Sequence, residues 1–472
     1  MKKIKNFLFL ILAISISNCL FAQKDSYNIK IQIKGLKDTV CYLANYYGDK
    51  QYIQDSARVD SKGNLFFKKN KKLPEGIYII ILPNKSYFEI IITDKPNFSF
   101  SADTSHSVKN IKIKGSPENT RFYDYIKFVN SKRKSLDSLK LIQKKVKTKE
   151  DSIAIKDKIK GIDNEVESHI NNLMGKYPND LFVKVLKSQN EIKIPAPPKL
   201  PNGSIDSNFQ YFYYKTHYFD NIDFNDERIV RTPIYHSKLD YFFKNVVLQI
   251  PDSIIKESDI VIEKTKGSKE LFKYTVYYLT YNSERSPVMG MDAVFVHMIE
   301  KYYQTGQAFW VDSASLAKVI DRARILKPLL LGNPAPFLII QDTSGQNISN
   351  YDIKADFLIQ IFWEPSCGHC QKELPHFVEL NEKLKKENIN AEVLTICTGS
   401  DVKEWKKFIR EKKMNLFNGM DLNGRYYYKE LYDIFSTPVV YILNNKKQII
   451  AKRIGVEQIE QFLKNEIKNK KK

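Results

Sequence analysis

Residues 362–375 read FWEPSCGHCQKELP, with Cys367 and Cys370 three positions apart and Gly368 and His369 between them. Such a pair can carry electrons as a dithiol, bind a metal ion, or consist of two small residues at the start of a helix. The apolar run DFLIQIFW precedes the pair, and a helical pattern follows it. We therefore expect the cysteines to open a helix directly after a buried strand.

The spacing of the two cysteines suits disulfide exchange. Residues i and i+3 on the first helical turn lie on one side of the helix, close enough for their sulfurs to bond. Cys367 falls at the helix N-terminus, where free N–H groups and the helix dipole stabilise the nucleophilic thiolate. We predict that Cys367 attacks a partner's disulfide and that the more buried Cys370 resolves the mixed disulfide. His369 adds a titratable donor that favours the thiolate further.

Glu373 lies one turn beyond Cys370 on the same face of the expected helix. A partly buried carboxylate there can accept the proton that Cys370 must lose before it attacks. The alternative interpretation is an exposed helix carboxylate without a catalytic role. Pro375, five residues after Cys370, is expected to kink the helix.

The surrounding sequence predicts a mixed α/β domain over residues 332–472, with helices on both faces of the sheet. Gly332, Pro334 and Pro336 end a helix and begin this domain. Strands are expected at 337–341, in DFLIQIFW and in AEVLTICT, and helices in DVKEWKKFIREKK and YYKELYDIF. A hairpin, TPVVYILNNKKQIIAKRI, and a lysine-rich helix close the chain.

This region resembles the thioredoxin superfamily, and the exported TlpA-like (ResA-like) branch most closely. The resemblance rests on FW ahead of the motif, on Cys367-Gly368-His369-Cys370, Glu373 and Pro375, and on the late STPVVYIL. In that family a cis Thr-Pro peptide faces the cysteine pair, which implies that Thr437 and Pro438 form a backbone edge for a substrate segment. Trp363 and His369 are further substrate-contact candidates.

Two features depart from the family pattern. Ser366 stands where thioredoxins usually carry Trp before the first cysteine, and Glu364-Pro365 precede it. Both change the rim of the site, so the choice of partner does not carry over from the family. The Gly-His core resembles protein disulfide isomerases, whose potential is about −180 mV against about −270 mV for thioredoxin. Reduction of disulfides is expected first, with isomerase or oxidase action as the alternative.

The chain before residue 332 predicts two further regions. Residues 23–115 contain short runs rich in Ile, Val, Tyr and Phe, many of them alternating, which predict an antiparallel β-sandwich. Residues 116–331 change to helical spacing and form a helical middle region. Both regions resemble, more loosely, the N-terminal β domain and helical middle of large exported thioredoxin-like bacterial proteins, which implies no activity for them. Cys41 and Cys397 are expected to be buried core residues.

The N-terminus predicts export. Lys2, Lys3 and Lys5 precede an apolar run at 7–16, and Ala22 offers a small residue for cleavage, so residues 1–22 are interpreted as a signal peptide. Lipid attachment at Cys19 is a weaker alternative. We expect a periplasmic or cell-envelope protein without a later membrane span. The net charge of +21, from 75 Lys and Arg against 54 Asp and Glu, is spread along the chain and indicates a solvated basic surface.

Three other functions are alternatives to disulfide exchange. A metal site built from Cys367, His369 and Cys370 lacks a second cluster at zinc spacing. A peroxidase requires Thr or Ser three residues before the reactive cysteine, where this chain has Glu364. A binding or chaperone-like envelope module would make the redox pair accessory. The favoured function implies no metal and no organic cofactor, no nucleic acid, disulfide-containing envelope proteins as clients, and an upstream dithiol protein as electron donor.

Overall fold

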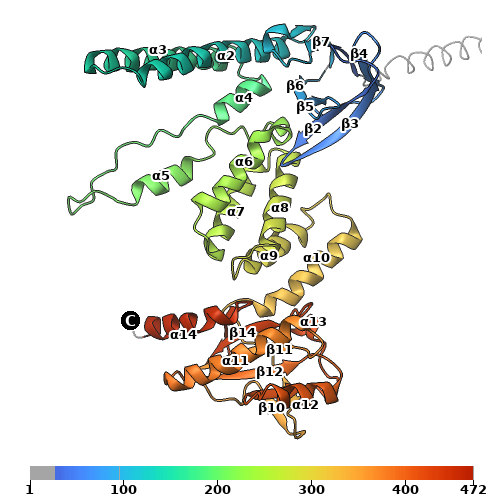
Figure 1. The fold of residues 1–472 in the computed structure, drawn as a ribbon, viewed down its shortest axis with the longest axis vertical. Helices are drawn as coiled ribbons and strands as arrows, with labels where there is room; N and C mark the ends of the chain where they lie inside the picture. Colours follow the sequence, from blue (N-terminus) through green and yellow to red (C-terminus); the bar gives the residue numbers. More distant parts are fainter. Residues whose placement is uncertain (1–26, 95, 471–472) are drawn as a thin grey trace, which may run out of the picture. The chain divides into compact units, whose positions relative to one another are not determined.

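The computed structural model describes residues 27–94 and 96–470. The expected signal peptide and Cys19 lie outside the described residues. The described residues divide into two compact units. One contains the described residues up to 247 together with 264–274, and the other contains 248–263 and the described residues from 275 onward. The fold is multidomain: N-terminal sheets, a helical middle region and a C-terminal sheet-rich domain follow one another along the chain (Figure 1). No helix in the described ranges combines the length and the hydropathy needed to cross a membrane.

The N-terminal strands form two four-stranded sheets with the orders β4-β1-β7-β8 and β3-β2-β5-β6. Alternating residues of both sheets share one core, in which Ile29, Cys41 and Phe67 are fully buried. Pairing is antiparallel except between β1 and β7, which run parallel, so the expectation of a wholly antiparallel sandwich was wrong at this pair. The strands are β1 (Tyr27–Lys34), β2 (Val40–Tyr47), β3 (Lys50–Arg58), β4 (Asn64–Lys69), β5 (Gly76–Ile81), β6 (Tyr87–Ile92), β7 (Asn97–Asp103) and β8 (Lys112–Lys114).

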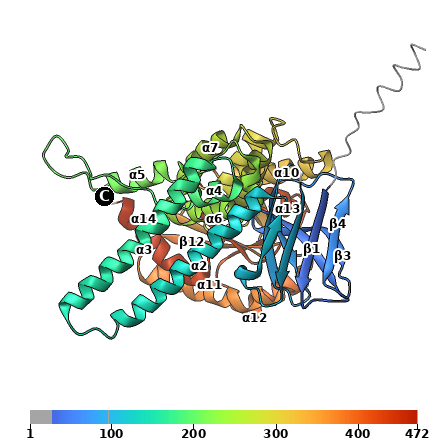
Figure 2. The same cartoon turned by 90° about the horizontal axis from the view of Figure 1, so that it is seen from above.

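Two long helices, α2 (Pro117–Gln143) and α3 (Lys149–Lys176), form a hairpin and lie side by side in both views (Figures 1 and 2). The hairpin is fixed to the sandwich by Asn119, whose buried side chain bonds both the N–H and the C=O of Ile91, each at 2.7 Å. A polar side chain with both partners satisfied is stable in such a core. The start of α2 is therefore anchored to β6 of the sandwich.

The remaining helices of the middle region are shorter, and the unit boundary runs through α7 and α8. Helices α9 and α10 belong wholly to the same unit as the C-terminal domain. The bounds are α4 (Leu181–Ser188), α5 (Phe209–His217), α6 (Pro233–Tyr241), α7 (Pro251–Thr265), α8 (Lys269–Glu284), α9 (Asp292–Met298) and α10 (Ser313–Leu326).

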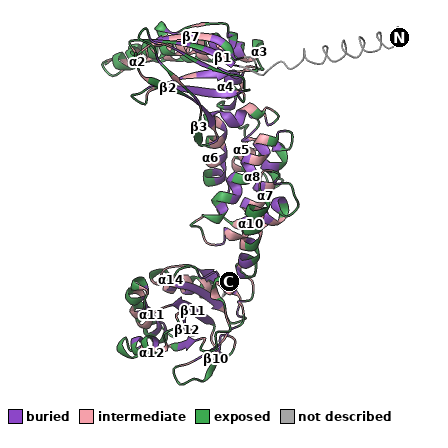
Figure 3. Ribbon diagram, turned by 90° about the vertical axis from the view of Figure 1, so that its right-hand side faces the viewer, coloured by how far each residue is buried: buried purple, intermediate pink, exposed green. Residues whose placement is uncertain are grey.

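The C-terminal domain is a seven-stranded mixed sheet with the order β10-β9-β13-β12-β11-β14-β15. β11 lies centrally, parallel to β12 and antiparallel to β14, and is buried along its whole length (Figure 3). The strands are β9 (Ile339–Gln341), β10 (Asn347–Ser349), β11 (Phe357–Trp363), β12 (Ala391–Cys397), β13 (Phe417–Met420), β14 (Val439–Asn444) and β15 (Ile449–Lys452). The short strands β10 and β13 were not predicted.

Alternate residues of β11 enter two separate cores, one on each face of the sheet. Ile359, Ile361 and Trp363 pack with residues of α11 (Gly368–Lys386), α12 (Val402–Glu411) and α14 (Val456–Lys470). Leu358 and Phe362 pack instead with residues around the short helix α13 (Tyr428–Leu431) and the segment before β9. The long helices thus cover one face, and the other face is covered mainly by loops and α13.

Candidate redox site

Cys367 is the residue that caps the N-terminus of α11. Its sulfur accepts a hydrogen bond from the backbone N–H of Cys370 at 3.2 Å, so the sulfur takes the place of the capping oxygen of a Ser or Asp. Its thiol also donates to the carbonyl oxygen of Thr437 at 3.2 Å. The side chain is half-buried, which leaves a face of the sulfur open to a reaction partner.

The helix terminus changes the acidity of Cys367. Burial by itself would raise the pKa of this thiol, but hydrogen bonds from the side chains of Cys370 and Thr437 and from the backbone N–H groups of Cys370 and His369 outweigh it. The pKa of Cys367 therefore lies below its ordinary value. A thiol with a lowered pKa at a helix N-terminus is the nucleophilic kind.

Cys370 has the opposite character. Its side chain is fully buried, and this burial, together with its hydrogen bond to Cys367, raises its pKa to about 12. No disulfide joins the two sulfurs in the structure. The pair therefore consists of one accessible thiol that ionises easily and one buried thiol that stays protonated until a base removes its proton.

The peptide between Thr437 and Pro438 is cis. It lies between α13 and β14, and its carbonyl contact with Cys367 places this segment against the first cysteine. The structure thus places Thr437 and Pro438 beside Cys367, which in turn contacts Cys370.

The other predicted residues occupy different surroundings. Glu373 is half-buried on α11, one turn beyond Cys370, and His369 is exposed between the cysteines. Trp363 is fully buried, and its ring packs 4.9 Å, centroid to centroid, from that of Phe408. The expectation that Trp363 contacts substrate therefore does not fit its position: the strand alternation turns its side chain into the core beneath the site. Pro375 lies inside α11, which continues past it.

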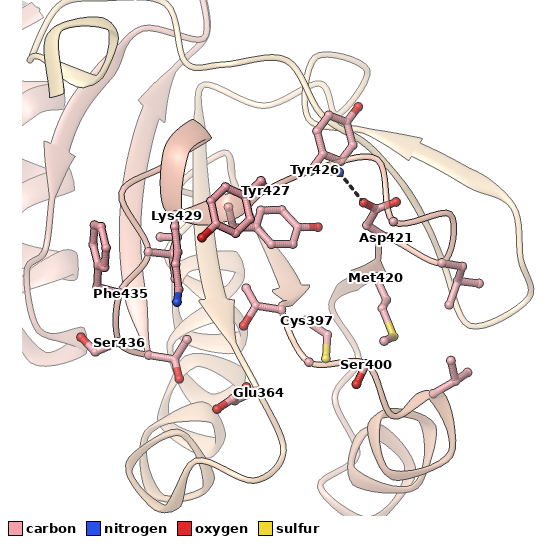
Figure 4. A pocket seen from close by; sticks show the side chains of 18 residues that line it. Glu364, Cys397, Ser400, Met420, Asp421, Tyr426, Tyr427, Lys429, Phe435 and Ser436 are labelled. Atoms are coloured by element: carbon pink, nitrogen blue, oxygen red, sulfur yellow. Dashed lines mark hydrogen bonds between the residues drawn. The ribbon is translucent and has the colours of Figure 1, made fainter. Parts of the chain in front are cut away.

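A cavity of about 620 Å³ is lined by Glu364, Cys397 and Thr437 among others, and Thr437 is the lining residue that contacts Cys367. Figure 4 shows Cys397 between Phe435 and Lys429 on one side and Met420, Asp421 and Tyr426 on the other. Cys397 is nevertheless 1% exposed, and burial raises the pKa of its thiol to about 12, so it is a core residue as expected and a poor nucleophile.

Sequence reasoning missed the position of Glu364. Its backbone N–H stabilises the Cys370 sulfur, and its carboxylate lies close enough to Cys397 to contribute to the raised pKa of that thiol. The only signal in the sequence was its place three residues before Cys367. Elsewhere, Cys41 is buried in β2, and this burial raises its pKa to about 11. Across residues 27–94 and 96–470, no group of three or more His, Cys, Asp or Glu side chains is arranged to hold a metal ion.

Three family models match the chain. The AhpC/TSA family matches residues 331–452, which contain the cysteine pair. Two domains of unknown function, DUF4369 and DUF5106, match residues 27–122 and 163–327. DUF4369 covers the β-sandwich and the start of α2, and DUF5106 covers most of the middle helices.

Curated relatives match the C-terminal region. The thiol-disulfide oxidoreductase ResA of Bacillus thuringiensis subsp. konkukian (strain 97-27) is 24% identical over 137 residues, which is 28% of this chain and 77% of that protein. ResA of Geobacillus kaustophilus (strain HTA426) is 26% identical over 140 residues, 29% of this chain and 77% of that protein.

Two solved structures are also similar. A domain of a "possible thiol-disulfide isomerase" from Cytophaga hutchinsonii ATCC 33406 is 40% identical, with a TM-score of 0.29, and the match covers 30% of this chain and 97% of that one. A thioredoxin-like protein from Bacteroides caccae ATCC 43185 is 22% identical, with a TM-score of 0.44, over 58% of this chain and 99% of that one.

Proposed function

Because this chain belongs to the ResA-like, thioredoxin-fold thiol-disulfide oxidoreductases, we propose that it is an exported member of them that reduces disulfides in envelope proteins. The proposal depends on one observation, the asymmetry of the cysteine pair. Cys367 is half-buried, has a lowered pKa and caps the N-terminus of α11, whereas Cys370 is fully buried in the first turn of the same helix. This asymmetry assigns the roles, since the accessible thiolate attacks and the buried thiol resolves.

The reaction is a two-step exchange. The Cys367 thiolate attacks one sulfur of a client disulfide, so that a bond forms between Cys367 and that sulfur while the other client sulfur leaves as a thiolate. Cys370 then loses its proton and attacks Cys367. The Cys367–Cys370 disulfide forms and the second client sulfur leaves. Two electrons have passed to the client, and an upstream dithiol protein returns the pair to its reduced state.

The second step needs a base, because the pKa of Cys370 is raised to about 12. Glu373 is our candidate: it is half-buried and one helical turn from Cys370 on α11. Glu364 is the competing carboxylate, since its own backbone touches the Cys370 sulfur. A carboxylate in this role contributes about 10²–10⁴-fold to a proton transfer.

Thr437, Pro438 and His369 are proposed to meet the client. Thr437 already contacts the attacking sulfur, and the exposed His369 lies between the two cysteines. The same hydrogen bonds that lower the pKa of Cys367 stabilise the reduced pair, which makes the pair a stronger oxidant. For this reason isomerase or oxidase action is the second candidate function.

The proposed compartment is the periplasm or another part of the cell envelope. The support is the basic and apolar pattern of residues 1–22, together with the oxidising chemistry that a disulfide-bonded client requires. Clients are proposed to be disulfide-containing envelope proteins.

Trapping tests the proposal. In Cys370→Ala, the mixed disulfide on Cys367 cannot be resolved, so client proteins should remain covalently attached and be released by dithiothreitol. Cys367→Ala is the control and should trap nothing. If the Cys370→Ala variant captures no partner from an envelope fraction, the exchange mechanism is wrong.

Equilibration with glutathione decides the direction of electron flow. A reduction potential of about −270 mV or lower supports a reductase, whereas a value of about −180 mV or higher supports isomerase or oxidase action. Rapid consumption of hydrogen peroxide by the reduced chain would instead favour a peroxidase.

A further inference from the structure

Arg322 is a residue of α10, in the helical region before the thioredoxin fold, yet its side chain contacts the segment that runs from α13 to β14. Its guanidinium holds both carboxylate oxygens of Asp433, with Nη2 lying 3.0 Å from Oδ2. Asp433 is 1% exposed. Bidentate pairing of this kind fixes orientation as well as distance.

Asp433 fixes the backbone at the start of this segment. It has a φ of 55°, in the left-handed region where Asp is among the few tolerated residues. Arg453, at the end of β15, donates to its Oδ2 at 2.7 Å and to its backbone oxygen at 2.9 Å. Two arginines from different parts of the unit therefore hold one buried carboxylate, and Arg453 alone remains if Arg322 is replaced.

Arg322 also reaches the rim of the redox site. Its guanidinium carbon lies 5.5 Å from the ring centroid of Phe435, within the range of a cation–π contact. Phe435 is 63% exposed, and its side chain lines the cavity of about 620 Å³ (Figure 4). Thr437, which contacts Cys367, lines the same cavity. An exposed aromatic ring has few other restraints, so the guanidinium limits the directions in which the ring can point.

The far end of the same segment touches the reactive sulfur, because the carbonyl oxygen of Thr437 accepts the Cys367 thiol at 3.2 Å. Three residues lie between Asp433 and Thr437, and the first of them, Ile434, donates its backbone N–H to the carbonyl oxygen of Tyr428 at 3.3 Å. The position of the Thr437 carbonyl thus depends on how firmly Asp433 and Phe435 are held.

We propose that Arg322 is a positioning residue for disulfide exchange: it holds residues 433–437 in place so that a client's peptide segment meets a fixed surface beside Cys367. This inference rests on the proposed function and extends it, since it makes the helical region part of the redox site. A residue outside residues 332–472 would then determine how well peptide disulfides react.

Loss of the Arg322 contacts should affect peptide disulfides and small disulfides to different degrees. A peptide disulfide must lie against the backbone of residues 433–437, whereas a small disulfide reaches the open face of Cys367 directly. Misplacement of reacting groups by about 1 Å can lower a rate by about 100-fold, and a partial loosening should lower it less. Replacement of Arg322 should therefore slow peptide disulfides while leaving small disulfides nearly unchanged.

The test measures single-turnover rate constants of the reduced full chain with two probes: a synthetic peptide closed by one disulfide, and hydroxyethyl disulfide. For Arg322→Gln we expect about a tenfold fall with the peptide and less than a twofold change with the small probe. Arg322→Lys keeps the charge but loses the bidentate contact, and should recover part of the peptide rate. Lys318→Gln is the matched control, because Lys318 is exposed one turn earlier on α10.

The outcomes separate the two proposals. If the unaltered chain reduces neither probe, the proposed function fails. If it reduces both, and Arg322→Gln lowers the two rates equally or not at all, Arg322 is not a positioning residue. A double replacement with Asp433→Asn adds a second check: the effects on the peptide rate should be non-additive, because both changes remove the same contact.

Discussion

The sulfur of Cys367 accepts the backbone N–H of Cys370 at 3.2 Å, so the two cysteines are joined by a hydrogen bond before any disulfide forms between them. This contact makes the sulfur of Cys367 part of the helix terminus. It stabilises the thiolate of Cys367, and the proximity of that sulfur helps to raise the pKa of Cys370. One helical turn therefore lowers the pKa of Cys367 and raises the pKa of Cys370.

The first prediction concerns the ionisation of Cys367. Its alkylation rate by iodoacetamide, measured in Cys370→Ala, should rise with pH around a midpoint below that of free glutathione, because hydrogen bonds stabilise the thiolate. The replacement removes only the side-chain bond of Cys370 and keeps its backbone N–H. An alkylation profile that follows glutathione would mean that the helix terminus does not lower the pKa.

The second prediction identifies the proton acceptor for Cys370. Glu373→Gln should slow the release of the mixed disulfide by at least about tenfold, with the attack step unchanged, because only the second step needs a base. Rapid quenching and mass spectrometry would show the accumulated intermediate. Glu382→Gln, an exposed carboxylate on the same helix, is the control. If Glu364→Gln slowed release while Glu373→Gln did not, the role would belong to Glu364.

The third prediction concerns the ion pair that links the helical region to the thioredoxin fold. The Lys452 side chain is 7% exposed, pairs with Asp292 of α9 and donates to the carbonyl of Leu329 at 2.6 Å. Asp292→Asn leaves a buried cation without its partner charge and should lower the free energy of unfolding by about 3 kcal/mol.

Tryptophan fluorescence can follow this unfolding, since Trp310, Trp363 and Trp405 all lie in the second unit. The control is Glu300→Gln, which removes the pair between Lys327 and Glu300, whose side chains are 60% and 40% exposed. An exposed pair contributes less than about 1 kcal/mol. Equal losses in the two variants would contradict the assignment of Lys452 as a buried anchor.

The fourth prediction concerns Glu118, near the start of α2, whose carboxylate accepts the backbone N–H of Leu181 at 2.5 Å. Burial, helped by the negative charge of Asp180, raises the pKa of Glu118 from 4.5 to about 7. At a pH between 4.5 and about 7, Glu118 is protonated in the folded state and ionised in the unfolded state. The protonated carboxyl group therefore contributes its full stabilisation below pH 4.5, and this contribution is lost as the pH rises through about 7.

The measurement compares urea unfolding by circular dichroism at pH 5 and pH 8. Between pH 5 and pH 8, the free energy of unfolding of the first unit should fall by about 2–4 kcal/mol more in the unaltered chain than in Glu118→Gln. The amide oxygen of the variant still accepts the hydrogen bond from Leu181. The tryptophan transition of the second unit serves as the internal reference. A variant that keeps the same pH dependence as the unaltered chain would rule out Glu118 as its source.

Much of the fold could be predicted from local pattern. Alternation identified strands of the sandwich such as β1 and β7, and helical spacing identified α2 and α3, because each residue's environment repeats with the period of its element. The parallel pairing of β1 with β7 could not be predicted, since a strand's own sequence records which face is buried and not which neighbour it pairs with.

The sequence by itself determined the chemistry: two cysteines at the start of a helix, the first more accessible than the second, because the spacing of residues on one helical turn is fixed by local geometry. Only the tertiary structure decided what surrounds them. It buried Trp363 beneath the site, brought Glu364 to Cys370, placed Cys397 in the wall of the cavity, and set Arg322 of the helical region against Asp433. These contacts join residues up to 111 positions apart, and no periodicity within one element records a partner at that separation.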